Sequence, residues 1–128
     1  MPSDAVQFLS VDEAIAIHER LIEQFGGTPG IRDKGLLESA MYRPRTGYYA
    51  DLGEMAAALF QSLLMNHAFL DGNKRAAFFV TDTFLRLNGW KLQAEAASAN
   101  AFIVGMLEAG DCSFEEIRSW IGDALVKT

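Results

Sequence analysis

Apolar residues recur at helical spacing along most of the chain, and residues that start or stop helices bound each repeat. The first repeat follows Ser10-Val-Asp-Glu13, a serine and a glutamate spaced as in a capping box, and it stops at Gly26-Gly27. Similar signals predict a set of helices at about 11–25, 34–42, 52–66, 73–87, 98–108 and 114–125. The pattern therefore predicts an all-α bundle of about six helices.

The stretch Leu52 to Asn66 is apolar around nearly the whole helix, with Gln61 and Ser62 as the interior exceptions. A helix without a polar face is buried by its neighbours, so we expect this one at the centre of the bundle. On the first helix, His18 lies on the apolar stripe, and we interpret it as a core or boundary histidine.

The helix predicted at 73–87 has a small, apolar inner face around Ala76 and Ala77. On its other side we expect Thr81, Asp82 and Arg86 to face solvent. After it, residues 90–93 alternate in polarity over a length too short to decide between a strand and a loop.

Composition agrees with one globular domain spanning residues 1–128. Hydrophobic residues make up 50% and charged residues 22% of the chain, and no low-complexity linker divides it. The formal net charge of −6 and the pI near 4.8 disfavour direct binding of nucleic acid or an anionic membrane.

The remaining compositional signals concern location. The one cysteine, Cys112, excludes an internal disulfide and fits a reducing cytosol. Met1-Pro-Ser-Asp4 has neither the basic nor the apolar region of a signal peptide, and the apolar run Met55 to Phe60 is too short to span a bilayer. We therefore expect a cytoplasmic protein.

Between the two most apolar helices lies the polar stretch His67-Ala-Phe-Leu-Asp-Gly-Asn-Lys-Arg75. Asp71-Gly72-Asn73 is turn chemistry, and the next helix begins at about Asn73 or Lys74. The free amides at such a helix start bind anions, and Lys74 and Arg75 would add full charges for phosphate oxygens. First-turn cations are repelled by the positive helix end, a misfit that favours an anionic ligand.

Two side chains of this stretch suggest further chemistry. His67 is a candidate general base, although the negative end of the preceding helix favours a protonated imidazole and the sequence does not show what offsets it. Asp71 supplies a hard oxygen ligand for a Mg²⁺ ion that carries nucleotide phosphates.

These residues match the H-x-F-x-(D/E)-G-N-x-R signature, so the sequence resembles the Fic-domain proteins and, in its Asn-Lys-Arg ending, their death-on-curing (Doc) branch. The segments Gly26 to Asp33, Gly35 to Ala40 and Arg43-Pro-Arg45 also resemble Doc-like chains. The resemblance covers roughly residues 8 to 125 and implies a compact Fic/Doc-like bundle with a short flap loop.

The resemblance implies transfer from a nucleoside triphosphate, such as ATP, to a hydroxyl group of a target protein. Its phosphates would lie on the amides of Gly72, Asn73, Lys74 and Arg75, with Mg²⁺ on Asp71 and His67 as the base. Attack on the γ-phosphorus gives phosphorylation, and attack on the α-phosphorus gives AMP transfer.

A comparison with the motif of AMP-transferring Fic proteins helps to decide between the two reactions. Phe78 stands where many AMP-transferring members carry a second arginine, and Lys74 stands where they usually carry glycine. Gly72 keeps the AMP-transferring form. We favour phosphorylation, with Fic-type AMP transfer as the alternative. A third interpretation is a non-catalytic nucleotide-binding or antitoxin-bound regulatory module, against which the intact His67 argues.

The resemblance also implies partners. For Doc toxins it suggests elongation factor Tu, a translation factor, as the target whose modification arrests growth. No glutamate here precedes glycine or asparagine, so the inhibitory S/T-x-x-x-E-G/N motif of self-restrained Fic proteins is missing, which implies a separate antitoxin of the Phd type. Residues 43–49 allow two interpretations. They are a surface connector whose tyrosines pack on the core, or they are the flap, and as the flap they would bring Arg43 and Arg45 into contact with nucleotide or target.

Overall fold

The computed structural model describes residues 5–110 and 112–128. Residues 1–4, on which the expectation of no signal peptide rests, lie outside it. The described elements, in chain order, are α1 Val11–Phe25, α2 Lys34–Tyr42, the 3-10 helix η2 Arg43–Arg45, α3 Leu52–Asn66, α4 Asn73–Leu87, β1 Trp90–Leu92, α5 Ala96–Ala109, α6 Phe114–Ala124 and β2 Leu125–Lys127. The predicted helical bundle is confirmed, and within these residues no helix has the length and hydropathy that crossing a bilayer requires.

Local sequence signals set most of the helix starts. The side chain of Ser10 accepts from the amide of Glu13, and the Glu13 carboxylate accepts from the amide of Ser10, so the capping box of α1 is confirmed. Side chains also cap α2, α3 and α6, from Asp33, Asp51 and Ser113 respectively. Each cap satisfies an amide that has no partner within its own helix.

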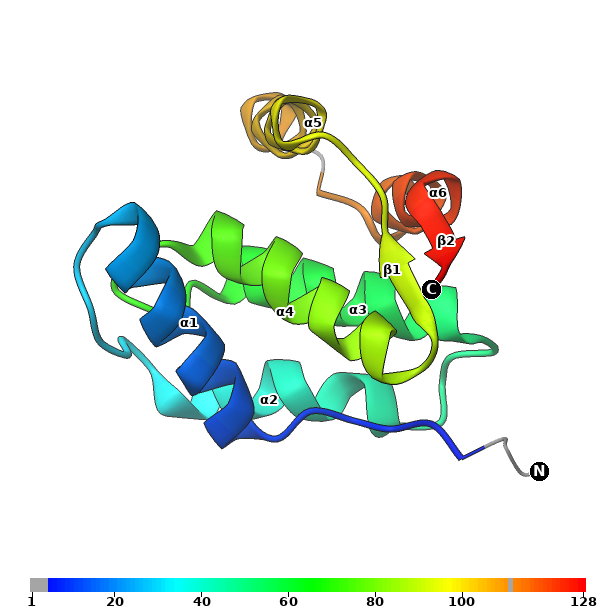
Figure 1. Ribbon diagram of the computed structural model, residues 1–128, viewed down its shortest axis with the longest axis horizontal. Helices are drawn as coiled ribbons and strands as arrows, with labels where there is room; N and C mark the ends of the chain where they lie inside the picture. Colours follow the sequence, from blue (N-terminus) through cyan, green and yellow to red (C-terminus); the bar gives the residue numbers. More distant parts are fainter. Residues whose placement is uncertain (1–4, 111) are drawn as a thin grey trace.

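Helix α3 is the centre of the bundle, as its apolar sequence predicts. It packs against α2, α4 and α6, and Figure 1 shows α4 running alongside it in the opposite direction. Phe60 and Leu63 of α3 are at most 1% exposed. Because α3 and α4 are held side by side along their length, the loop that joins them is fixed at one end of the bundle.

Two expectations about the second half of the chain are wrong. Thr81 and Asp82 are buried, not solvent-facing, because β1 packs on α4 in addition to α1 and α3. Leu125 does not extend the last helix: it pairs with Leu92 in an antiparallel two-stranded sheet, β1–β2.

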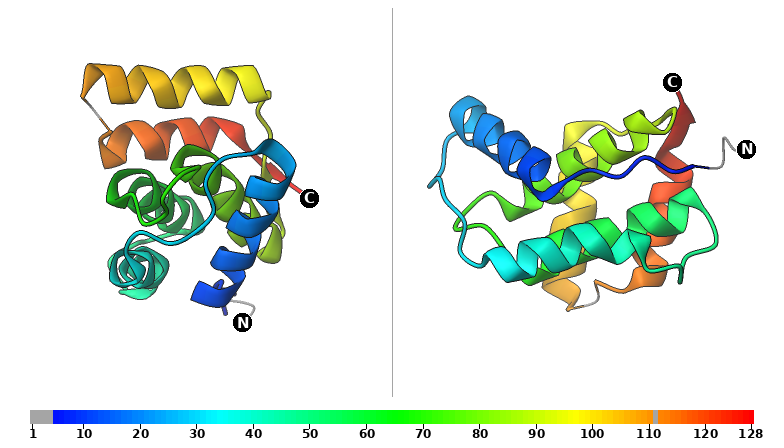
Figure 2. Two further views of the ribbon diagram at one scale, coloured as in Figure 1. Left: turned by 90° about the vertical axis from the view of Figure 1, so that its left-hand side faces the viewer. Right: turned by 90° about the horizontal axis from the view of Figure 1, so that it is seen from below.

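The connection between α1 and α2 returns to the α3–α4 loop, at the left of Figure 1 and in both views of Figure 2. Ile31 and Phe69 form an isolated antiparallel bridge. The carbonyl of Ala68 accepts from the amides of Arg32 and Asp33, at 2.7 and 3.0 Å. Residues 26–33 therefore lie beside the motif His67–Arg75 in space although they are distant from it in sequence.

The segment 43–49 lies elsewhere. It follows α2 at the end remote from the motif loop, about 13 Å along a nine-residue helix. The Arg43 guanidinium donates to Gln61, Ser62 and the carbonyl of Ala58, all on α3. In this segment Tyr49 packs against Phe114 and Tyr48 is exposed, and the loop that lies beside the motif is 26–33.

Arg45 is also turned away from the motif loop. Its guanidinium carbon lies 5.0 Å from the centroid of the Phe8 ring, and it lines a separate groove with Leu9 and Tyr42. Neither arginine is placed to contact a ligand held by the motif loop.

Candidate active site

His67 is the residue at which α3 ends. It adopts the left-handed conformation, with φ 50° and ψ 50°, and among the described residues it is the only non-glycine residue with positive φ. Such a conformation costs free energy for a side-chain-bearing residue and is found most often at functional sites. The imidazole is exposed and makes no hydrogen bond within the described part of the chain. His67 is therefore held by its backbone, with a ring free to meet a substrate.

The contact that holds this backbone comes from Arg32. Its Nε donates to the carbonyl of His67 at 2.6 Å, and an Nη donates to the carbonyl of Asn66 at 2.9 Å. These carbonyls have no partner at the end of a helix, where the macrodipole is negative. The guanidinium satisfies both carbonyls and so fixes the backbone from which the His67 ring projects.

His18 supports the loop from beneath. It is 2% exposed, its ring is stacked on that of Phe69 at 3.8 Å and 4°, and its Nε2 donates to the carbonyl of Asp71 at 2.8 Å. The interpretation of His18 as a core residue is confirmed. Sequence spacing did not show that it also fixes the backbone of the motif.

Asn73 closes the loop on itself. Its side-chain oxygen accepts from the amide of Phe69 at 3.1 Å, and its side-chain nitrogen donates to the carbonyl of Phe69 at 3.0 Å. Each polar atom of the side chain thus makes one hydrogen bond that fixes loop geometry, and the backbone amide of Asn73 remains for a ligand. Gly72 supplies the left-handed turn, with φ 74°, that lets the chain enter α4.

The start of α4 differs from the capped helix starts described above. No described side chain accepts a hydrogen bond from its first amides. Lys74 and Arg75 are exposed in this first turn, and the Arg75 guanidinium carbon lies 4.4 Å from the centroid of the Phe25 ring. Uncapped amides at the positive end of a 15-residue helix, flanked by two cations, suit an anion.

Asp71 points its carboxylate at the neighbouring loop. Oδ2 accepts from the amide of Thr28 at 3.0 Å and Oδ1 accepts from the amide of Gly72 at 2.8 Å. These hydrogen bonds, first that from Thr28, lower the pKa of Asp71 below its ordinary value of 3.8. The carboxylate is therefore charged at neutral pH.

The donor set around Asp71 fits magnesium in one particular way. Each oxygen of Asp71 keeps a lone pair beyond its backbone hydrogen bond. No group of three or more His, Cys, Asp or Glu side chains that would hold a metal occurs among the described residues. A single carboxylate suits Mg²⁺ that arrives with phosphates and keeps its waters, rather than an ion bound by protein alone.

We expect Gly27→Ala to weaken the metal-dependent binding of a nucleotide about tenfold, as disturbed metal-site neighbours do. Gly27 has φ 115°, and a Cβ added there would lie 2.8 Å from Oδ2 of Asp71 and push the carboxylate aside. Gly26→Ala is the matched control, because Gly26 also has positive φ, 87°, but no atom within 4 Å of the added Cβ. Titration of both variants with Mg²⁺ and ATP checks this; equal affinities would contradict it.

Comparison with known proteins agrees with this arrangement. Residues 8–85 match the Fic/DOC family. The chain is 40% identical over 101 residues to a protein named Toxin Doc from Mycolicibacterium smegmatis, covering 74% of this chain and 78% of that protein. It is 36% identical over 88 residues to Protein kinase doc of Escherichia phage P1, covering 66% of this chain and 70% of that protein.

Proposed function

The chain belongs to the Fic/DOC family, and from that premise we propose that it is a Doc-like toxin that transfers the γ-phosphoryl group of ATP to a hydroxyl group of a target protein. One observation carries the proposal: the uncapped start of α4, with Lys74 and Arg75, directly follows the loop that begins at His67. The name Protein kinase doc, given to a relative, favours this class of reaction.

The phosphates would lie on the amides of Asn73, Lys74 and Arg75, where helix dipole and side-chain charge have the same sign. Asp71 would hold Mg²⁺, which would supply charge neutralisation to the phosphates. Because the loop is already ordered by Asn73 and His18, these donors need little rearrangement to receive a ligand.

The imidazole of His67 would accept the proton of the target hydroxyl as its oxygen forms a bond to the γ-phosphorus. The bond between that phosphorus and the oxygen bridging to the β-phosphorus breaks, and ADP leaves with the electron pair. Lys74 and Arg75 offset the charge on the phosphoryl oxygens. AMP transfer differs only in that the α-phosphorus is attacked and pyrophosphate leaves.

A protein partner is part of the proposal. Phe25 at the end of α1, Met65 near the end of α3 and Leu70 in the motif loop are large apolar side chains that are 45%, 51% and 55% exposed. Exposed apolar surface of this kind often marks a site where a partner protein binds. We propose that a separate antitoxin of the Phd type covers this surface. Growth arrest on expression of the chain alone, relieved by co-expression of its antitoxin, would support this; growth unaffected by the chain alone would count against it.

ATP labelled on either the γ- or the α-phosphorus, incubated with the chain and a bacterial extract, separates the reactions. Label from the γ-phosphorus on a protein, identified by mass spectrometry, is the expected result, and we propose elongation factor Tu as that protein. Label from the α-phosphorus alone would establish AMP transfer. No label from either would leave the regulatory module as the better account.

A further inference from the structure

Arg32 makes contacts that its place on the surface does not require. The side chain is exposed, so water could hydrate its guanidinium, yet Nε donates to the carbonyl of His67 at 2.6 Å and Nη2 donates to the carbonyl of Asn66 at 2.9 Å. A long side chain loses rotamer freedom when it is held in one geometry. The reason for these two hydrogen bonds therefore lies in what they do at the end of α3.

The pairing of the two loops does not depend on this side chain. The backbone amides of Arg32 and Asp33 donate to the carbonyl of Ala68. The backbone amide of Leu70 donates to the carbonyl of Gly30. These hydrogen bonds remain possible with alanine, glutamine or lysine at position 32, because each of these residues keeps its backbone amide. The guanidinium is therefore not needed to hold residues 26–33 beside the motif loop.

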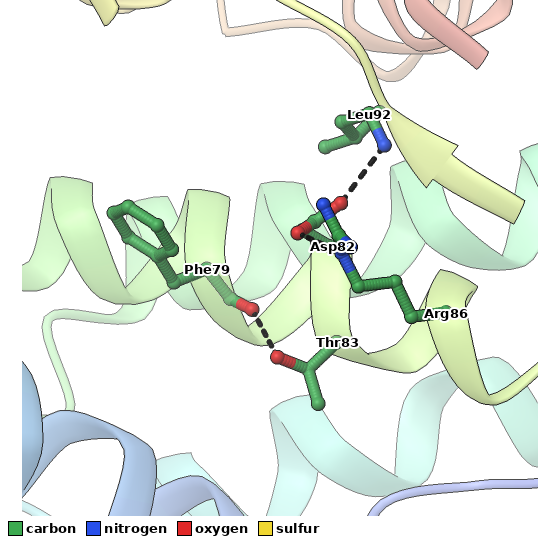
Figure 3. A network of polar contacts seen from close by, with 5 residues as sticks. All are labelled: Phe79, Asp82, Thr83, Arg86 and Leu92. Carbon is green, nitrogen blue, oxygen red and sulfur yellow. Dashed lines mark hydrogen bonds and ion pairs between the residues drawn. The ribbon is translucent and has the colours of Figure 1, made fainter. Parts of the chain in front are cut away.

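A contact that mainly stabilises packing has a different setting. Asp82 ties β1 to α4, since Oδ1 accepts from the amide of Leu92 at 2.8 Å and Oδ2 accepts from Nε of Arg86 at 2.7 Å (Figure 3). Asp82 is 8% exposed, so water competes little for its hydrogen bonds. The hydrogen bonds of Arg32 are exposed to water and contribute less to stability, and their effect is local to the peptide groups that they contact.

Those two peptide groups lie on either side of the Cα atom of His67. The planes of the peptide groups before and after a residue define its φ and ψ, and the planar guanidinium holds the carbonyl of each. The φ of 50° and ψ of 50° at His67 are unfavourable for a residue with a side chain. Relaxation to right-handed helical angles would extend α3 by one residue and turn the Cα–Cβ bond in another direction.

We propose that Arg32 is a positioning residue, which aims the imidazole of His67 at the target hydroxyl by holding the peptide groups on both sides of it. The inference rests on the proposed function and deepens it, because it makes the connection between α1 and α2 part of the control of the transfer rate. In this role Arg32 contacts neither nucleotide nor target and acts only through His67.

Truncation of Arg32 tests this role. We expect Arg32→Ala to lower kcat for phosphoryl transfer about 10- to 10²-fold, since a small misplacement of a reacting group costs that much, and to leave the affinity for Mg²⁺-ATP unchanged. Arg32→Lys keeps the charge without the planar fork and should recover only part of the rate. Lys34→Ala is the matched control, because Lys34 is an exposed cation two residues further on, in α2, and it should leave kcat unchanged.

A spectroscopic measurement separates positioning from other effects. The three-bond coupling between the amide and α protons of residue 67 depends on φ, so it should change in Arg32→Ala and stay at the wild-type value in Lys34→Ala. Thermal unfolding comes first, and Arg32→Gln replaces the alanine variant if that variant does not fold. Loss of the fold in both variants would overturn the inference, because the role of Arg32 would then be structural.

The remaining outcomes distinguish the inference from the proposed function. Wild-type kcat in Arg32→Ala, an equal loss in Lys34→Ala, or a lower kcat with an unchanged coupling at residue 67 overturns the inference while the proposed function stands. A loss confined to ATP affinity also overturns it, because Arg32 would then act on the nucleotide. If the wild-type chain transfers no phosphoryl group, the proposed function fails and the inference fails with it.

Discussion

Replacement of His67 by alanine is expected to slow transfer of the labelled phosphoryl group about 10²- to 10⁴-fold, the usual contribution of a positioned general base. The imidazole is exposed and makes no hydrogen bond within the described residues, so its removal breaks no hydrogen bond of the fold. The fold should therefore survive, and the affinity for Mg²⁺-ATP should change little, because the proposed phosphate site is formed by the first turn of α4 and not by this ring.

The control for this variant concerns the backbone, because His67 has positive φ. Asparagine tolerates the left-handed conformation better than alanine and cannot act as a base near neutral pH. His67→Asn should therefore match wild type in thermal unfolding and match His67→Ala in activity. Substantial activity in the asparagine variant would show that His67 contributes the left-handed backbone conformation at this position and not proton removal.

Replacement of both Lys74 and Arg75 by glutamine is expected to lower the transfer rate at limiting ATP about 10²- to 10³-fold. At position 75 glutamine keeps part of the side-chain length over the Phe25 ring. Both changes remove a charge that would face the phosphates in the proposed site. The loss should appear in kcat as well as KM, because negative charge develops on the oxygen bridging to the β-phosphorus as its bond to the transferred group breaks.

Arg20→Gln is a matched control for the loss of charge, since Arg20 is an exposed cation of α1 outside the motif loop. It should leave kcat/KM unchanged. Equal effects of the α4 double variant and the Arg20 variant would mean that net charge, and not contact with the nucleotide, decides the rate. Arg75→Lys restores the charge without the fork of two donors and should recover only part of the activity.

The helices were predictable because the signals that define them are local. A capping serine, a helical repeat and a terminating glycine all lie within a few residues of one another, as Ser10 and Glu13 show. Strand β2 was missed for the opposite reason: Leu125 continues the apolar face of α6, and only its pairing with Leu92 draws it into a sheet. Asp82 was misplaced because periodicity gives the faces of α4 but not how many other elements cover them.

The sequence predicted the part of the candidate site that is formed by neighbouring residues, but not the contacts made by residues far away in the chain. The loop chemistry of Asp71, Gly72, Lys74 and Arg75 could be read from adjacent residues. Arg32 acts across 35 positions of sequence, and no spacing rule connects it to His67. A signal did exist, because the stretch 26–33 belongs to the part of the chain that resembles Doc-like proteins. What the resemblance could not supply is which atoms those residues contact.

The side chain of Asn73 shows a further limit. An amide in a phosphate-handling motif invites a ligand-binding interpretation, yet both of its polar atoms bond the backbone of Phe69. Composition cannot separate the two roles, since turn residues and phosphate-binding loops use the same amino acids. The hydrogen bonds that the structure does show for this side chain set the shape of the loop.

The claim on which everything depends is that the first turn of α4 binds a triphosphate beside His67. The most direct measurement is a titration of isotope-labelled protein with Mg²⁺-ATP, followed through the backbone amide resonances. The account predicts saturable shifts at Gly72, Asn73, Lys74 and Arg75, together with Thr28, whose amide bonds Asp71. Saturable binding that leaves these amides unmoved, or no binding at all, would contradict it.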